Sequence, residues 1–580
     1  MPPRLTDLNG NRFDVIVIGG GINGASTAQH LAAAGYSTLI VDKGDFGSGA
    51  SSRSSRLLHC GLRYLAPGRS ILDFVRHPNR FAVALRMARL AMQARSEFVR
   101  TCPNRTNAMM LHFPVYRDGP YAAWQIRAAF ALLKRLGGEE IPLDYRWMGP
   151  QEARTHPLIG GLRDCHRLVG VAAFREFQFN WPERIVLDAV LDAERMGATA
   201  RNYTAARLSG FAQDRGWTVE LSDALAPAAP VRVQGGIVLM TSGVWIDAVV
   251  RGVNAQAGRK IFGTKGCHLL VKLPAACAGA GIATLNSRHE PLYCIPWKQY
   301  HYFGPTETAY EGDPDRVFVT AEEADGIIAD ANVLLPGLNL TPADIRMSWA
   351  GVRPLTYDPA VPFGNRSRVI HDLAADGLPS ALALTAGPVM THRSAARELT
   401  RLVAQRLDPS RQSHNPNYGP PAERRGAEHA ATLSDELFRR RGTAWSGPLH
   451  TEDLSSAASE LGAVLAWDQA RMLAEQRRFE AEWNDWYASP YARQERSPLT
   501  VAAGTQQDAS SREEQTMSIK GKHVTRRDAL KLTSGVVAAG FSMPWAAGRG
   551  LAQQAATLRA GIAGFNVINT LDPMKATLIP

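Results

Sequence analysis

Three glycines near the N-terminus have the spacing that cradles a phosphate group. Gly19, Gly21 and Gly24 form GxGxxG directly after the apolar run at residues 14–18, and they open a segment of small residues, 22–35. The first glycine permits a tight turn, the second lets the backbone approach a diphosphate, and the third lets the following helix pack closely. The amides at the N-terminus of that helix then face the negative charge.

An acidic residue completes this pattern. Asp42 ends a second strand-like stretch, 23 positions after Gly19, where a carboxylate accepts hydrogen bonds from a ribose 2′-hydroxyl and disfavours a 2′-phosphate. The sequence therefore predicts a strand–turn–helix unit that binds an adenine dinucleotide. The glycines by themselves do not decide between a flavin and a nicotinamide. No second GxGxxG follows in the chain.

A run of serine and basic residues follows this unit. Residues 51–65 read SSRSSRLLHCGLRYL and bring Arg53, Arg56, His59, Arg63 and Tyr64 into a short stretch. Such groups can bind an anion through charge-assisted hydrogen bonds. Taken alone, the run could equally be a solvated basic turn.

The same stretch resembles the FAD-dependent glycerol-3-phosphate dehydrogenases, in which it has the form SSRSxKLxHGGLRYL. Further blocks of the chain are similar to that family in the same order, over roughly residues 13–486. The family's NATGPW, KGSH, SGVRPL and GGKLTTYR correspond to residues 240–245, 265–268, 350–355 and 386–393.

The resemblance implies an α/β protein, α+β overall, with a Rossmann-like FAD-binding domain interleaved with a mixed-sheet substrate domain and followed by a small helical domain. We expect the FAD-binding domain at 13–80, 165–260 and 345–408, the substrate domain at 81–164 and 261–344, and the helical domain at 420–487. Residues 488–516 are polar and poor in aromatic residues, so we expect a linker there.

The resemblance also assigns roles to particular side chains. His268, in the block similar to KGSH, is the candidate base for removing a hydroxyl proton. Arg353 would act beside it in catalysis, and Arg63, Tyr64, Arg353 and Arg393 would bind an anionic substrate. The cofactor FAD would lie against a larger set of residues: Gly19, Gly21, Asn23, Gly24, Asp42, Ser51, Ser52 and Gly387. Electrons would leave the flavin for a quinone, with oxygen as the fallback.

Several residues depart from the family's pattern. Pro388 stands where GGKLTTYR has its lysine, so a cation expected near the flavin and the substrate is missing. Met240 replaces an asparagine and Cys60 a glycine. Because a singly charged carboxylate needs fewer cations than a phosphate dianion, a flavin oxidoreductase acting on an amino acid or amine is the main alternative. A catalytically inactive FAD-binding protein is the second.

Composition narrows the class of protein further. The 580 residues include 45% hydrophobic residues and six cysteines, and the cysteines form no CxxC pair. This pattern argues against a bound metal and a disulfide framework, and it favours a reducing compartment. The net charge of +11 fits an anionic substrate, peripheral contact with the inner membrane or an ordinary soluble surface equally well, and no nucleic-acid motif accompanies it. We therefore expect a cytoplasmic enzyme.

The last part of the chain has a different pattern. Arg526 and Arg527, an apolar run at 536–547 and small residues at 550–552 have the order of a twin-arginine export signal. Residues beyond them resemble the start of periplasmic solute-binding proteins of ABC importers. Our hypothesis is that Met517 begins a neighbouring reading frame and that 517–580 form a signal-like tail, because export signals work from an N-terminus. We do not expect this tail to direct export.

Overall fold

A computed structural model describes residues 3–496 apart from 66–73, 75, 77, 138–139, 227, 287, 289, 362, 422–423 and 425. The expected signal-like tail at 517–580, and most of the expected linker at 488–516, lie outside the described residues. One compact unit contains Met1–Tyr491 and holds every element given below except the end of the last helix. Among the residues described, no helix is both long enough and apolar enough to cross a bilayer.

The first sheet is built around the predicted nucleotide-binding strand. Its order is β17-β18-β10-β1-β2-β7, and the hairpin β8–β9 joins it through β10. Strands β18, β10, β1, β2 and β7 run parallel to one another. The bounds are β1 Arg12–Ile18, β2 Thr38–Val41, β7 Thr199–Arg201, β8 Thr204–Ala212, β9 Gly216–Asp223, β10 Val231–Met240, β17 Val369–Asp372 and β18 Ala381–Thr385.

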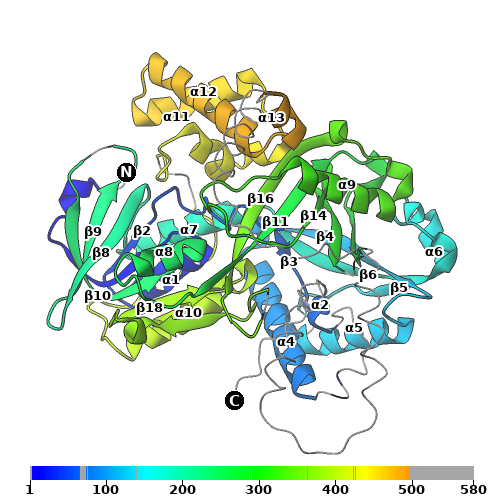
Figure 1. Cartoon of the computed structure of the whole chain (residues 1–580), viewed down its shortest axis with the longest axis horizontal. Helices are drawn as coiled ribbons and strands as arrows, with labels where there is room; N and C mark the ends of the chain where they lie inside the picture. The colour runs from blue at the N-terminus through cyan, green and yellow to red at the C-terminus, as the bar shows by residue number, and fades with distance from the viewer. Residues whose placement is uncertain are drawn as a thin grey trace, which may run out of the picture. The chain divides into compact units, whose positions relative to one another are not determined.

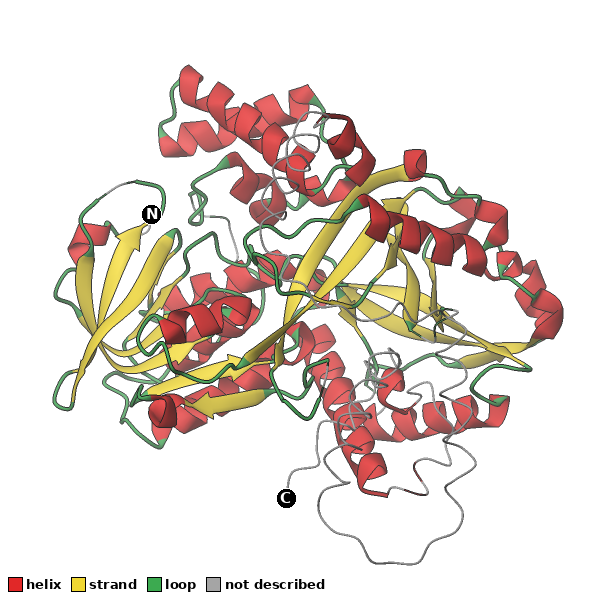
Figure 2. Cartoon of the chain, viewed as in Figure 1, coloured by secondary structure: helices red, strands yellow, loops and turns green. Residues whose placement is uncertain are grey.

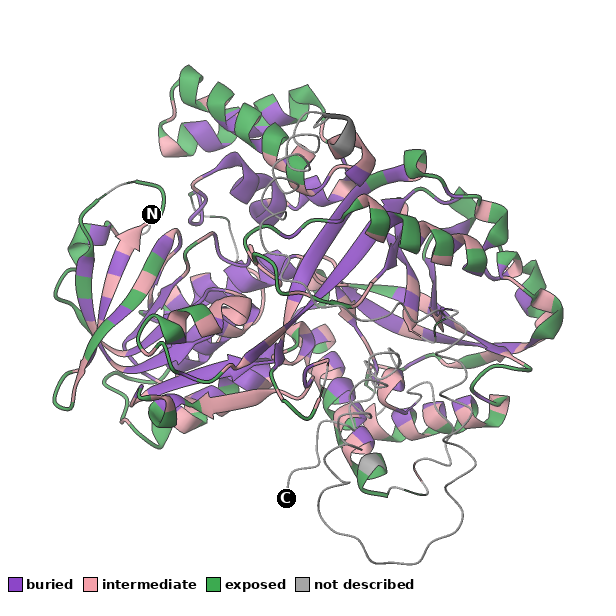
Figure 3. Cartoon of the chain, viewed as in Figure 1, coloured by how far each residue is buried: buried purple, intermediate pink, exposed green. Residues whose placement is uncertain are grey.

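Both faces of this sheet are covered, which explains why β1 is apolar without alternation. Val15 and Val17 pack on one side in a cluster with helices α1 (Ile22–Ala33), α7 (Pro182–Arg195) and α10 (His392–Ala404). Ile16 and Ile18 pack on the other side with β9 and α8 (Ile246–Arg251). Strands β1, β2, β10 and β18 are buried along most of their length (Figure 3).

The second sheet is larger and mixed. Its order is β15-β11-β14-β13-β12-β4-β6-β3, with β16 paired to β11 and β5 paired to β6. The long antiparallel pair β11–β16 carries two of the predicted site segments (Figure 1). The bounds are β3 Leu57–Leu58, β4 Thr106–Tyr116, β5 Arg146–Met148, β6 Leu168–Phe179, β11 Ile261–Val271, β12 Ala280–Leu285, β13 Pro291–Trp297, β14 Tyr300–Gly304, β15 Thr308–Ala309 and β16 Ile345–Thr356.

Helices border the second sheet and follow it in the chain (Figure 2). Helix α4 packs against α5, and α11 packs against α12 after a π-helical segment at Asp435–Arg440. The remaining bounds are α2 Leu62–Leu65, α4 Pro78–Thr101, α5 Ala123–Gly137, α6 Pro150–Thr155, α9 Ala321–Leu334, α11 Thr451–Leu465, α12 Gln469–Trp486 and α13 Pro490–Arg496.

The predicted α/β class and the two interleaved parts are confirmed, but two segments belong to a different sheet from the one expected. The expected boundaries put residues 168–179 and 345–356 in the FAD-binding domain, whereas β6 and β16 pair with β4 and β11 in the second sheet. The physical reason is the long antiparallel register of each pair, which buries apolar residues of both strands. Helix α13 also occupies part of the expected linker.

Candidate functional site

The glycine turn closes against the end of β10. Gly19 has a φ of +108°, and a Cβ added there would lie 2.6 Å from the Ser242 backbone. A Cβ on Gly24 would lie 1.9 Å from the Gly19 carbonyl oxygen. Around Gly21 only the Ser51 Oγ comes within 4 Å of an added Cβ, at 3.3 Å. The first and third glycines are therefore required by packing, and the second leaves the backbone accessible.

Asp42 lies at the end of β2 and reaches back to this turn. Its Oδ2 accepts a hydrogen bond from the Gly20 amide at 2.6 Å, and its Oδ1 accepts one from Gly44 at 2.8 Å. Burial raises the pKa of Asp42 to about 6, although the two amides oppose this shift. The carboxylate thus lies against the glycine turn, where the sequence predicts a contact with the ribose.

Segments far apart in the chain meet at the start of α1. The Ser51 Oγ accepts a hydrogen bond from the Ile22 amide at 3.0 Å, and the Asn23 Nδ2 donates to the Gly387 carbonyl at 2.8 Å. The Ser52 Oγ bonds within its own loop, to the carbonyls of Ser48 and Gly49. The structure therefore gathers the predicted cofactor residues at one helix N-terminus.

These residues fit a dinucleotide. The Ile22 amide donates to Ser51, but the next amides of α1, those of Asn23 and Gly24, have no acceptor within the helix and are available to a phosphate. Among the described residues, the buried Asn23 Oδ1, Ser242 Oγ and Trp245 Nε1 have no hydrogen-bond partner. Buried polar atoms normally have partners. Their grouping around the turn is what a bound ligand with polar groups would satisfy.

His268 lies on β11 and is enclosed. Its side chain is 1% exposed and stacks on Trp349, with ring centroids 4.8 Å apart and planes inclined by 10°. Its Nε2 lies 3.0 Å from the Ser55 Oγ on the serine loop. Burial, and then the charges of Arg353 and Arg56, lower the pKa of His268 well below its ordinary value. The imidazole is therefore neutral near pH 7, as a base must be.

A cluster of cations lies beside this histidine. The guanidinium of Arg353, on β16, packs directly against Gly266. A Cβ added to Gly266 would lie 2.3 Å from the Arg353 Nη2. Arg366 donates to the Glu307 carboxylate. Burial lowers the pKa of Arg366 to about 10, Glu307 opposes the shift, and Arg63 and Arg353 lower it further. We call Arg63, Arg353, Arg366 and Glu307 the basic cluster.

Arg63 and Tyr64 belong to the same region. The Arg63 guanidinium lies 5.7 Å from the centroid of the Tyr64 ring. Burial works against the charge on Arg63, but Tyr64, Tyr293 and Glu307 raise its pKa. The structure thus places the charge of Arg353 beside His268, and it places Arg63, Tyr64 and Arg353 around Arg366. It adds Arg366, which the sequence analysis missed because its loop after β16 matches no motif.

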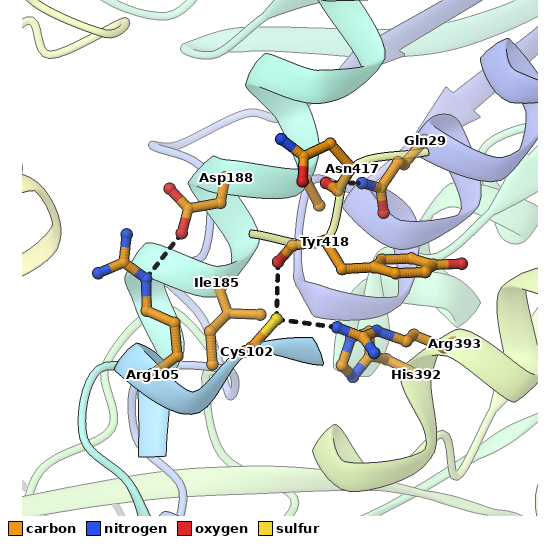
Figure 4. A pocket seen from close by; sticks show the side chains of 10 residues that line it. Gln29, Cys102, Arg105, Ile185, Asp188, His392, Arg393, Asn417 and Tyr418 are labelled. Carbon is orange, nitrogen blue, oxygen red and sulfur yellow. Dashed lines mark hydrogen bonds and ion pairs between the residues drawn. The ribbon is translucent and has the colours of Figure 1, made fainter. Parts of the chain in front are cut away.

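Arg393 lies elsewhere. It lies in the first turn of α10 and is buried against the C-terminal end of α4. Its Nη1 donates to the Thr101 Oγ1 at 2.6 Å and its Nη2 to the Cys102 Sγ at 3.1 Å. Its guanidinium lies 3.9 Å from the centroid of the Tyr418 ring. Figure 4 shows it lining a small pocket that also contains the Arg105–Asp188 ion pair. The structure does not bring Arg393 to the basic cluster, because its side chain is committed to these partners.

Pro388 lies on the surface between Gly387 and the start of α10. No cation occupies this position, as the sequence already indicates. The charge that Arg366 contributes comes from a different part of the chain.

Comparison with known proteins agrees with this arrangement. Residues 14–397 match the family described as FAD dependent oxidoreductase, DAO. A glycerol-3-phosphate dehydrogenase of Synechocystis sp. is 31% identical over 414 residues, which are 69% of this chain and 71% of that protein. The curated relatives also include an aerobic glycerol-3-phosphate dehydrogenase of Staphylococcus saprophyticus, 25% identical over 69% of this chain and 68% of its own length.

A solved structure shares the fold. The glycerol-3-phosphate dehydrogenase from Bacillus halodurans, complexed with FAD, superimposes with a TM-score of 0.59 at 20% sequence identity. The superposition covers 83% of this chain and 96% of that one. The family match covers residues 14–397, and it includes the glycine turn and the acid after β2. The chain therefore belongs to the DAO family of FAD-dependent oxidoreductases, and FAD is its cofactor.

Proposed function

We propose that this protein oxidises sn-glycerol 3-phosphate to dihydroxyacetone phosphate. The observation that carries the proposal is the basic cluster beside a neutral, buried His268. Three arginines and one glutamate leave an excess of positive charge, which suits a phosphate dianion. The names of the curated relatives support the same substrate.

The roles of the residues follow from their chemistry. Arg63, Arg353 and Arg366 would hold the phosphate, with the Tyr64 hydroxyl as a further donor. His268 would take the proton of the secondary hydroxyl at Nε2, the nitrogen that lies 3.0 Å from the Ser55 Oγ. FAD, bound at the glycine turn, supplies the acceptor for the hydride that leaves the same carbon. Removing the proton as the hydride leaves avoids a charged intermediate.

Arg366 bears on the choice between substrates. The sequence alone suggests a weaker anion site, because Pro388 replaces the family's lysine. Arg366 supplies a cation from the loop after β16 and so makes up for that loss. This favours the phosphate ester over a singly charged amino acid, which needs fewer cations.

Anaerobic reduction of the bound FAD tests the proposal. Glycerol 3-phosphate should bleach the flavin absorbance at a rate that saturates with substrate. Bleaching only by amino acids or N-methyl amines would replace the proposal with the amine alternative. A flavin that dithionite reduces but none of these compounds bleaches would indicate an inactive FAD-binding protein.

We further propose a quinone as the electron acceptor, with peripheral contact at the cytoplasmic face of the inner membrane. The support is the dehydrogenase naming of the relatives and a single dinucleotide motif in this chain. Reduced enzyme should be reoxidised faster by a ubiquinone analogue in liposomes than by air-saturated buffer. Equal or faster reoxidation by oxygen would contradict this acceptor.

A further inference from the structure

A buried carboxylate in the cofactor loop is held by the far end of the chain. Asp45 follows β2 by four residues and is 1% exposed. It accepts hydrogen bonds from Arg439 and from both terminal nitrogens of Arg440, one of them at 2.9 Å. The Asn202 Nδ2 donates to it at 2.8 Å. The two arginines lie 394 and 395 positions away in sequence.

The ionised state of Asp45 depends on these cations. A carboxylate removed from water is strongly disfavoured unless cations and hydrogen bonds compensate it. Burial alone would raise the pKa of Asp45, but Arg440 and Arg439 lower it well below its usual range. The buried carboxylate of this loop is therefore compensated by the segment around Arg440.

Phe46, the residue after Asp45, connects this loop to the glycine turn. The Phe46 ring lies against Gly20, where an added Cβ would be 2.4 Å from the Phe46 Cδ1. The Gly47 amide donates to the Gly20 carbonyl at 3.0 Å, and the Gly20 amide donates to Asp42. The turn and the ribose-binding acid are thus fixed by the loop that Asp45 anchors.

The same C-terminal segment contacts this loop at a second point. The His429 ring meets Phe46 edge-on, with centroids 5.4 Å apart and planes at 82°. The His429 carbonyl accepts a hydrogen bond from Asn202 at 2.7 Å, and Asn202 also donates to Asp45. Residues 428–440, which we call the clamp segment, therefore hold the loop by ion pairs and by aromatic packing.

The clamp segment lies outside the family match, which ends at residue 397. The FAD-binding turn lies inside it. We propose that the clamp segment positions the FAD-binding turn, and that Arg440 is a positioning residue for FAD which acts through Asp45 and Phe46. This holds for any substrate, so it stands apart from the proposed function.

Arg440→Met tests the proposal, and Arg441→Met is its matched control. Without Arg440, Asp45 keeps Arg439 and Asn202 as partners. Without Arg441, Glu436 keeps Arg424, which donates to it at 2.7 and 2.6 Å. Arg441 directly follows the clamp segment and also donates to the exposed Glu460. Each variant removes one cation and leaves a buried carboxylate that still has one arginine, but of the two only Arg440 contacts the cofactor loop.

The measurement is FAD dissociation from the holoenzyme. Each purified protein is diluted, and the fluorescence of released FAD gives the dissociation constant; the flavin content after purification is measured alongside. We expect Arg440→Met to raise the Kd about tenfold or more and Arg441→Met to change it less than twofold, because a displaced turn weakens charge-assisted contacts with the diphosphate. Arg440→Lys, which keeps the charge, should recover part of the affinity.

Thermal unfolding separates positioning from simple stabilisation. Both dissociation constants are taken well below the unfolding midpoint, so a variant that is merely less stable would bind FAD as the wild type does. A Kd for Arg440→Met within twofold of wild type overturns the proposal. If Arg440→Met does not fold, Phe46→Leu replaces it; the same rise in Kd is expected, and an unchanged Kd overturns the proposal.

Discussion

At the scale of single residues, the neutral state of His268 depends on its neighbours. Burial disfavours the imidazolium, and the positive charges of Arg353 and Arg56 disfavour it further. Its pKa therefore lies below the ordinary value of 6.5. As pH falls from 8 to 6.5, wild-type flavin reduction should not slow through protonation of this group.

Arg353→Met should shift the acid limb of the pH–rate profile for flavin reduction to higher pH. With one depressing charge removed, the pKa of His268 should rise toward its ordinary value. The readout is the limiting rate of anaerobic flavin reduction against pH at saturating substrate. An unchanged limb would mean that another group accepts the proton.

Arg366→Met should weaken substrate binding. A hydrogen bond to a charged group contributes about 1.5–3 kcal/mol, so KM should rise roughly 10- to 100-fold. Arg368→Met is the control, because Arg368 pairs with Ser394 and Glu398 on α10. Its KM should stay within twofold of wild type. Equal effects of the two variants would remove Arg366 from the anion site.

At the scale of elements, the contact between the turn and α1 leaves no room for a side chain. Gly24→Ala puts a methyl group 1.9 Å from the Gly19 carbonyl oxygen and 2.6 Å from the Thr241 Oγ1. We expect a loss of about 1–3 kcal/mol from overpacking and loss of bound FAD. Flavin absorbance per protein and the thermal midpoint measure both effects.

Gly326→Ala is the matching control within a helix. Gly326 lies in α9, and an added Cβ meets nothing within 4 Å. Removal of a helix glycine should stabilise the protein by about 0.5–1 kcal/mol and leave FAD binding unchanged. Retention of FAD in Gly24→Ala at the wild-type level would contradict the packing argument.

The elements differ in how far the sequence predicts them. The unit from β1 to Asp42 was predictable because its signals are local: an apolar run, glycines at fixed spacing and an acid after the next strand. The sheet membership of β6 and β16 was not, since it depends on partners distant in sequence. Arg393 was placed by resemblance, but the direction of its side chain from α10 is set by Thr101 and Tyr418.

At the scale of the whole molecule, burial of neutral histidines makes stability depend on pH. Below pH 6.5 the unfolded chain binds protons that these histidines do not bind in the folded state, so each group lowers stability by up to about 1.4 kcal/mol per pH unit. The pKa of His112 is lowered to about 4 and that of His392 to about 3, mainly by burial. The buried histidines with a lowered pKa are His30, His112, His268, His301 and His392.

Buried carboxyls with a raised pKa act in the opposite direction, and they are Asp42, Glu176, Glu183 and Asp435. Burial raises the pKa of Asp42 to about 6 and that of Glu176 to about 7, so the folded state gains protons there before the unfolded chain does. The histidines outnumber them, and we expect the thermal midpoint to fall between pH 6.5 and 5. Thermal unfolding at constant ionic strength checks this, and a midpoint that is flat or rises on acidification would contradict it.

The ion pair between Asp45 and Arg439 also has a consequence for biosynthesis. The two residues are 394 positions apart, and ribosomes add about 5–20 residues per second. Asp45 is therefore synthesised roughly 20–80 seconds before its arginine partners. Throughout that interval a nascent chain already carries its complete glycine turn. From the proposed role of the clamp segment we expect stable loading of the cofactor in the cell to be a late event, completed only after residue 440 has left the exit tunnel.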